Sequence, residues 1–120
     1  MSTVLITGSD NPRRTQYAAW LQSFGYEVYE TDTYDDAYHA LANASLPHPP
    51  NVLIIDVKLS APQARILIDT VRHTLHLTNM SIIVIGGDHQ LGDDGIDAFL
   101  QRPVEPFALV ESVRCACVPA

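Results

Sequence analysis

The chain has 120 residues, of which 47% are hydrophobic, and carries a formal net charge of −7. This length and hydrophobic content predict one globular domain over residues 1–120, able to bury a core without disulfides or metal. The acidic balance argues against nucleic acid as a partner, because such binding depends on basic side chains that neutralise phosphates. The apolar runs are far shorter than the ~20 residues of a membrane-spanning helix, so we expect no membrane partner and a cytoplasmic location.

The first expected element is a strand. Residues 3–7 are apolar and β-branched, which predicts a buried strand, and turn and capping residues follow it. A helix over about residues 12–24 comes next, because Trp20 and Phe24 belong to an apolar stripe at helical spacing that predicts one buried face. Residues 26–31 alternate between apolar and polar side chains, as in a half-exposed strand.

The middle of the chain repeats this alternation. A helix is expected over about residues 34–44, and a proline-rich stretch at 46–50 predicts a surface loop. Residues 51–57 contain a run of apolar side chains directly before Asp56, which is typical of a parallel strand buried on both faces. A third helix is expected over about residues 62–77.

The last third contains a second buried-strand pattern at residues 81–85. A short polar stretch at 89–95 leaves room for no more than one or two helical turns. A fifth strand over 96–100 and a helix over 105–117 complete the chain. Strands that alternate with helices predict an α/β fold with a parallel sheet and helices on both faces.

Ligands of such sheets gather at the carboxyl ends of the strands. Asp56 closes the third strand, and a carboxylate after four apolar residues must lie where water, a cation or a donor reaches it. We therefore expect a candidate site built around it. The residues expected at these strand ends are Gly8, Ser9, Asp10, Asp56, Lys58, Gly86, Gly87, Arg102 and Pro103.

The segments VLIT, GYEV, VLIID, IIVI and FLQRP resemble, in this order, the five strands of the receiver domain of two-component response regulators. The resemblance covers essentially the whole chain. It implies a flavodoxin-like three-layer (βα)5 sandwich with sheet order 2-1-3-4-5, and it assigns Asp56 as the acceptor of a phosphoryl group from a histidine kinase. In that family an acidic pair after the first strand binds Mg²⁺, a Thr or Ser follows the fourth strand, and a Lys precedes a proline after the fifth.

The chain departs from the family at the metal positions. The acidic pair falls on Gly8 and Ser9, with Asp10 one step beyond. A Mg²⁺ ion would then have only Asp10 and Asp56 as carboxylate ligands, a weak set for an ion that requires near-octahedral oxygen ligation. We expect Mg²⁺ binding to be weak or absent, and no other cofactor.

The remaining site positions depart as well. The hydroxyl position falls on Gly86 and the Lys position on Arg102, while the switch aromatic of the family corresponds to Phe99. The resemblance predicts a cis peptide bond between Arg102 and Pro103. A charge-assisted bond could hold the central carboxylate permanently if Asp10 and Arg102 both reach it.

These departures predict an atypical receiver, or pseudo-receiver, that is not an enzyme and acts by protein–protein interaction with a histidine kinase or a downstream effector. Phosphorylation at Asp56 is expected to be weak or absent. Two alternatives stay open. One is a phosphorylation-competent single-domain response regulator that uses Asp56, and the other is a flavodoxin-like binder of a nucleotide or flavin at the helix N-terminus near residues 7–11.

Exposed apolar side chains predict a contact surface. Ile66 and Ile68 flank the buried stripe of the third helix, and Leu91, Phe107 and Val110 surround a shortened fourth helix. We expect a homodimer through the face formed by the fourth helix, the fifth strand and the fifth helix.

Cysteine and histidine give no metal or disulfide framework. Cys115 and Cys117 are expected to be reduced and structural. His73, His76 and His89 lack the pattern of a metal site, and a solvated surface is the simpler interpretation.

Overall fold

The computed structural model describes residues 2–43, 50–57, 62–75, 79–86 and 95–117. The strands are β1 (Thr3–Thr7), β2 (Glu27–Thr31), β3 (Val52–Asp56), β4 (Ser81–Ile85) and β5 (Ala98–Leu100). The helices are α1 (Asn11–Ser23), α2 (Tyr34–Ala42), α3 (Pro62–Asp69), which continues into the π-helical turn η1 (Thr70–Thr74), and α4 (Pro106–Cys117).

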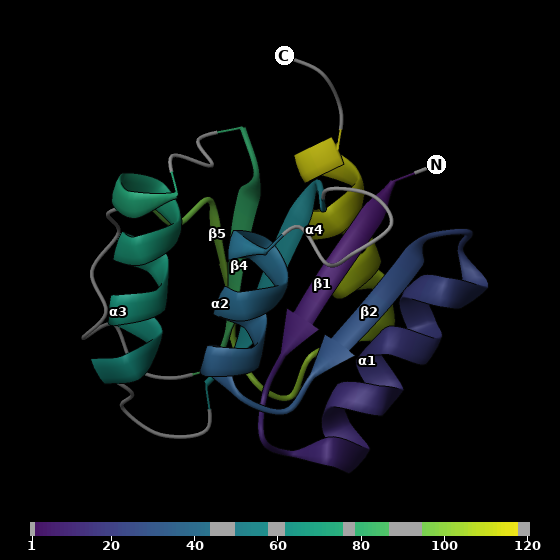
Figure 1. Cartoon of the computed structure of the whole chain (residues 1–120). Coiled ribbons are helices and arrows are strands. Elements are labelled where there is room, and N and C mark those ends of the chain that lie inside the picture. The colour runs from purple at the N-terminus through teal and green to yellow at the C-terminus, as the bar shows by residue number, and fades with distance from the viewer. Residues whose placement is uncertain (1, 44–49, 58–61, 76–78, 87–94, 118–120) are drawn as a thin grey trace.

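The strands form one parallel sheet with the order β2-β1-β3-β4-β5 (Figure 1). The predicted α/β class and the predicted sheet order are confirmed. Because β1 and β3 lie inside the sheet and are covered on both faces, every residue of these two strands is buried.

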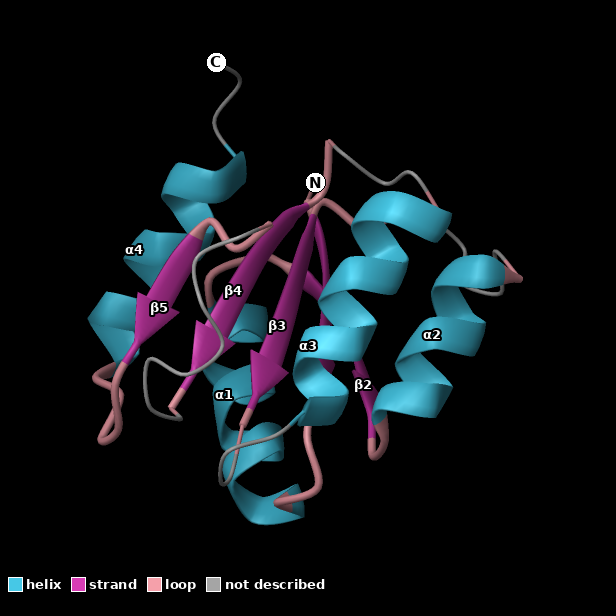
Figure 2. Ribbon diagram, turned by 90° about the vertical axis from the view of Figure 1, so that its left-hand side faces the viewer, coloured by secondary structure: helices cyan, strands magenta, loops and turns pink. Residues whose placement is uncertain are grey.

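Two hydrophobic cores lie on opposite faces of the sheet. Figure 2 shows α2 and α3 on one side and α1 and α4 on the other. The side chains of each strand alternate between the two cores, as the pleat requires. In β3, for example, Leu53 and Ile55 pack toward α2 and α3, whereas Val52 and Ile54 pack toward α1 and α4. The two helical layers and the sheet form a three-layer sandwich. Because the strands are parallel, their carboxyl ends all meet at one edge of the sheet.

The third helix does not run regularly over residues 62–77 as expected. It widens into η1 after Asp69, where Leu75 N donates to Thr70 O at 2.9 Å across five residues. The Thr70 hydroxyl donates to the Ile66 carbonyl at 2.7 Å and competes with the backbone for that acceptor. Arg72, on the widened turn, donates to Met80 O at 2.5 Å, which ties the turn to the residue before β4.

The fifth strand is shorter than the expected range of 96–100. Asp97, the residue before β5, pairs with Ile82 of β4 partly through its side chain. Asp97 N donates to Ile82 O at 2.8 Å, but Ile82 N donates to the Asp97 carboxylate oxygen Oδ2, at 2.7 Å, where a regular strand would offer a backbone carbonyl. The expected short helix within 89–95 and the exposed side chain of Leu91 lie outside the described residues, except for Gly95 at the end of that range.

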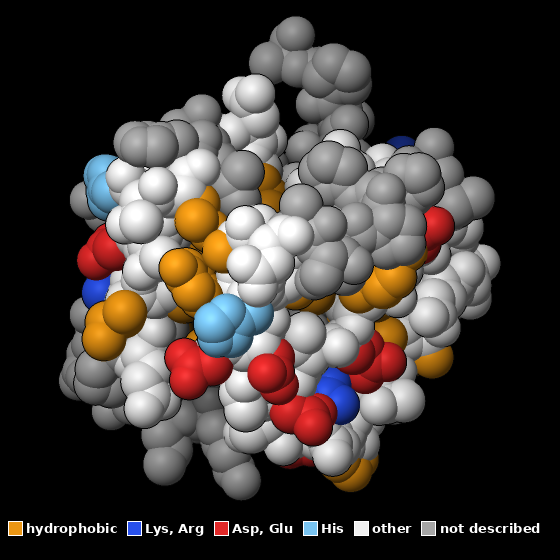
Figure 3. Space-filling view, viewed as in Figure 1, with side chains coloured by type: hydrophobic (Ala, Val, Ile, Leu, Met, Phe, Trp, Pro, Cys, Tyr) orange, Lys and Arg blue, Asp and Glu red, His pale blue; other side chains and the backbone are white. Residues whose placement is uncertain are grey.

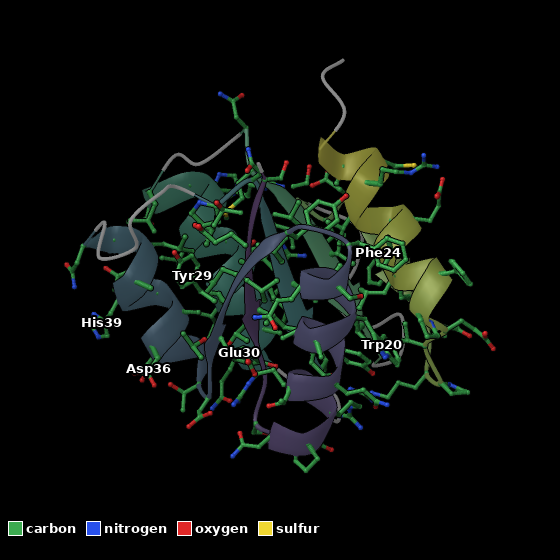
Figure 4. All side chains as sticks on the ribbon, turned by 90° about the vertical axis from the view of Figure 1, so that its right-hand side faces the viewer. Trp20, Phe24, Tyr29, Glu30, Asp36 and His39 are labelled. Atoms are coloured by element: carbon green, nitrogen blue, oxygen red, sulfur yellow. The ribbon has the colours of Figure 1, made fainter. Side chains whose placement is uncertain are left out.

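Several burial predictions are wrong. Phe24 was expected on the buried face of the first helix, but α1 ends at Ser23 and Phe24 is 55% exposed. Its ring lies beside α4 (Figure 4), in edge contact with Phe107 at 6.5 Å between centroids. Ile68 and Val110 were expected in exposed patches, but both are buried, because they lie on the inner faces of α3 and α4.

Cys115 is a free thiol, but it is exposed, which is contrary to a structural role in the core. The side chain of Cys117 lies outside the described part of the chain. None of the helices in the described ranges combines the length and the apolar character that crossing a membrane requires.

Candidate functional site

Asp56 is the last residue of the central strand β3, and it lies at the edge where all strands end. Its side chain is 1% exposed. A buried carboxylate is costly unless charged donors surround it. Here Arg102 Nη2 donates to Oδ1 at 2.6 Å, and Arg13 Nε donates to Oδ2 at 3.0 Å. Both oxygens of the carboxylate are therefore held by a guanidinium group.

Arg13 comes from the first turn of α1, and Asp10 is the N-cap residue of that helix. Asp10 Oδ1 accepts from Arg13 N at 3.1 Å, and Asp10 Oδ2 lies 3.4 Å from Arg13 Nη1. Burial acts to lower the pKa of Arg13, but the hydrogen bond to Asp56 and the charges of both carboxylates outweigh it, so that the pKa is raised. The guanidinium of Arg13 thus lies between Asp10 and Asp56, the two carboxylates that were expected to offer at most a weak metal site.

Arg102 follows β5 and precedes a cis peptide bond to Pro103. Its Nη2 also donates to the Val57 carbonyl. Gly86, which follows β4, has a φ of +77°, and a Cβ atom at this position would overlap with the Arg102 guanidinium. The glycine at the family's hydroxyl position therefore leaves the space that the arginine fills.

Gly8, after β1, makes a similar close approach. A Cβ atom at Gly8 would lie 2.8 Å from the Cβ of Asp56, so a longer side chain requires one of the two segments to shift. The Gly8 carbonyl accepts from Arg14 Nη1 at 2.6 Å. Arg14 is buried and also pairs with Glu30 at 3.0 Å and Asp32 at 2.6 Å, which fastens the start of α1 to the end of β2.

Two tyrosines flank the central carboxylate from opposite faces of the sheet. Tyr17 lies on α1 and Tyr34 on α2. Burial, together with the negative charge of Asp56, raises the pKa of both phenols. The Tyr34 hydroxyl also donates to the Asp56 backbone carbonyl at 3.4 Å.

The other expected site residues are less closely involved. Ser9 and Pro103 are exposed, and Phe99 is half-buried against the core beneath α2 and α3. Lys58 and Gly87 lie outside the described residues. Of the pair expected to reach Asp56, Arg102 contacts it directly, whereas Asp10 is connected to it through Arg13.

These residues do not fit a Mg²⁺ ion. The two expected ligands, Asp10 and Asp56, are already bridged by Arg13, and a dication would lie beside two guanidinium groups. In the ranges that the structure describes, no group of three or more His, Cys, Asp or Glu side chains could hold a metal ion. The expected anion cradle at residues 7–11 is also altered, because the Asp10 carboxylate caps the helix there.

Sequence reasoning missed Arg13 and Arg14. Both stand near the N-terminus of a helix, where an arginine is usually interpreted as solvated surface. The available signal was Asp10 as a capping residue with Arg13 three positions later, a spacing that places the two side chains on the same face of the first turn.

No protein-family model and no curated protein sequence matches the chain. Among solved structures, it is similar to a putative response regulator from Chloroflexus aurantiacus J-10-fl, with 27% identity, a TM-score of 0.80 and 96% of each chain covered. It is also similar to a CheY-like response regulator receiver domain protein from Methanospirillum hungatei JF-1, with 22% identity, a TM-score of 0.80, and 95% of this chain and 91% of that chain covered.

A further similar structure is the chemotaxis response regulator CheY4 of Vibrio cholerae, with 22% identity, a TM-score of 0.78, and 97% of this chain and 98% of that chain covered. The sheet order 2-1-3-4-5 and the placement of Asp56 at the end of β3 agree with this likeness. The chain has the fold of CheY-like response regulator receiver domains.

Proposed function

We propose that this receiver domain acts in signalling mainly by binding protein partners, a histidine kinase or a downstream effector, with weak or no Mg²⁺-dependent phosphorylation at Asp56. One observation carries the proposal: both oxygens of the Asp56 carboxylate accept from guanidinium groups, at 2.6 and 3.0 Å. A phosphoryl acceptor needs one oxygen free to attack and a cation placed to stabilise the transferred group. Here the cations are bound to the acceptor itself.

The glycines beside the carboxylate support the same proposal. Gly86 accommodates the Arg102 guanidinium, and Gly8 lies against Asp56 where a carboxylate side chain would need extra space. The site therefore favours a closed arrangement of two arginines around one carboxylate. Such an arrangement keeps the local charge fixed, so partners would recognise a constant surface rather than one changed by phosphate.

The alternative is a phosphorylation-competent response regulator. Two observations support it. Asp56 lies at the end of the central strand, and the side chain of Arg13 is 24% exposed, so that packing does not enclose its guanidinium completely. If Arg13 moves away, one oxygen of Asp56 becomes free.

Phosphodonor treatment tests the two possibilities. The wild type and Asp56→Asn are incubated with acetyl phosphate or beryllofluoride and Mg²⁺, and amide spectra and intact masses are recorded. We expect no saturable amide shifts around Asp56 and no added mass of a phosphoryl group. Saturable shifts in the wild type that are lost in Asp56→Asn would establish the phosphorylation-competent alternative.

The homodimer stays a prediction with a smaller basis than the sequence suggested. Phe107 is 76% exposed on α4, but Val110 is buried and contributes nothing to such a face. Light scattering of the wild type beside Phe107→Asp tests it. A monomer in both proteins counts against the dimer.

A further inference from the structure

A groove of about 490 Å³ lies between α2 and α3, on the face of the sheet opposite α1 and α4. We call it the α2–α3 groove. The residues that shape it are Tyr34, Asp35 and Tyr38 from α2, and Ile66, Leu67 and Thr70 from α3 and the start of η1.

The groove follows α3 and η1. On the α3 side its wall runs from Gln63 to Thr74 through residues three and four positions apart. This span corresponds to about 16 Å along a helix axis, the length of about three helical turns. A groove between two helices with this length suits a third helix packed along it.

The floor and one rim of the groove are apolar. Leu67 is 4% exposed at the floor, where Tyr34 and Tyr38 pack half-buried against the core. Ile66 stands on the rim with 62% of its surface exposed, one of only three large hydrophobic side chains exposed in the described residues. An apolar side chain beside an apolar floor gains free energy when a partner covers it.

The charged side chains near the groove are mainly acidic. Asp35 lines it and forms no ion pair within the described ranges. Figure 3 shows acidic and apolar side chains on this face of the molecule. Among the described residues that line the groove, none is a Lys or Arg. The complementary partner is basic.

We propose that the α2–α3 groove docks a basic amphipathic helix of a protein partner, about three turns long, with its apolar face on Ile66 and Leu67 and a cation against Asp35. Tyr34 lines the groove and donates to the Asp56 carbonyl at 3.4 Å, so the docked helix contacts a residue that touches the candidate site. This inference does not depend on whether Asp56 accepts phosphate.

The test uses a fluorescein-labelled peptide of about 14 residues, built from Leu and Lys at helical spacing, and its counterpart with Glu in place of Lys. Fluorescence anisotropy measures binding to the wild type and to Ile66→Glu. Phe107→Glu is the matched control, because this side chain is more exposed, at 76%, and lies on the other face. Amide spectra of the wild type with the Lys peptide locate the bound surface.

We expect the Lys peptide to bind and the Glu peptide not to bind. Ile66→Glu weakens binding at least about tenfold, whereas Phe107→Glu weakens it less than about twofold. Asp35→Asn weakens it about twofold to fivefold, and Glu105→Gln, which removes an exposed carboxylate near the start of α4, leaves it within about twofold. The amide shifts fall on α2, α3 and η1.

Four results overturn the inference. The first is no binding of the Lys peptide, the second is equal binding of the Glu peptide, and the third is equal weakening by Phe107→Glu. The fourth is a dimer of the wild type that Ile66→Glu dissociates, because the occupant is then a second copy of this chain. Phosphorylation of Asp56 would refute the proposed function but would leave these results unchanged.

Discussion

Replacing Arg102 with methionine tests the two-arginine arrangement most directly, because methionine keeps an apolar stem and removes the guanidinium. The variant loses the charge-assisted hydrogen bond to Asp56 Oδ1, 2.6 Å in the wild type, a bond of a kind worth about 1.5–3 kcal/mol. It also loses the bond to the Val57 carbonyl, about 0.5–1.5 kcal/mol. Since the Arg102 side chain is 24% exposed, solvent reduces the first contribution. We expect Arg102→Met to lower the free energy of unfolding by about 2–3 kcal/mol.

Urea unfolding followed by the fluorescence of Trp20, the single tryptophan, measures this change. Combining Arg102→Met with Asp56→Asn completes a double-mutant cycle, and we expect a coupling energy of about 1.5–3 kcal/mol. Arg114→Met is the matched control, because Arg114 pairs with Glu111 at 2.6 Å but is 65% exposed; its cost stays within about 0.5 kcal/mol. The reasoning is refuted if Arg102→Met costs no more than this control, or if the coupling energy is below about 0.5 kcal/mol.

Three further predictions follow from the same contacts. Arg13→Gln removes the cation between the two carboxylates, so an amide-shift titration should show Mg²⁺ binding at least about tenfold tighter than in the wild type, and unchanged affinity contradicts this role. Gly86 and Gly25 both have positive φ, but only a Cβ at Gly86 meets the Arg102 guanidinium; by urea unfolding, Gly86→Ala should cost at least about 1 kcal/mol more than Gly25→Ala, and equal costs contradict the contact. Folding raises the pKa of Tyr34, so the contribution of its neutral phenol to the free energy of unfolding is fully present below the unfolded pKa of about 10 and is lost as the pH rises through the higher folded pKa. Tyr34→Phe should therefore make the fall of the unfolding free energy at alkaline pH shallower than in the wild type. A fall of the same steepness counts against this assignment.

The strands were predictable where burial dominates the sequence. β3 and β4 each contain a run of four apolar residues because both faces of these strands are covered, and a run of this length is typical of a buried strand. The end of a strand is harder to predict, because side chains compete with the backbone there. Asp97 accepts from Ile82 N with its carboxylate, and the regular β5 begins one residue later. The wide turn at Thr70 similarly depends on a hydroxyl–carbonyl bond that helical periodicity does not reveal.

The candidate site was predictable to the extent that strand ends determine it. Asp56 ends a buried strand and Arg102 follows a half-buried one, and parallel strands bring such ends to one edge. Arg13 was not predictable in this way, because its contact with Asp56 spans 43 residues and depends on the angle at which α1 leaves the sheet. The sequence predicted the missing acidic pair at Gly8 and Ser9 but not the arginine that lies between the two remaining carboxylates.

The residues at the positions where the chain departs from the receiver pattern contact one another. Arg102 needs the space that Gly86 leaves, and its guanidinium then binds one oxygen of Asp56. Arg13 binds the other oxygen and pairs with Asp10, the carboxylate that remains from the expected metal set. A buried carboxylate without a metal needs cationic donors on both oxygens, and the two arginines supply them. Restoring a hydroxyl residue at position 86 alone would therefore displace a guanidinium before it could assist any phosphoryl transfer.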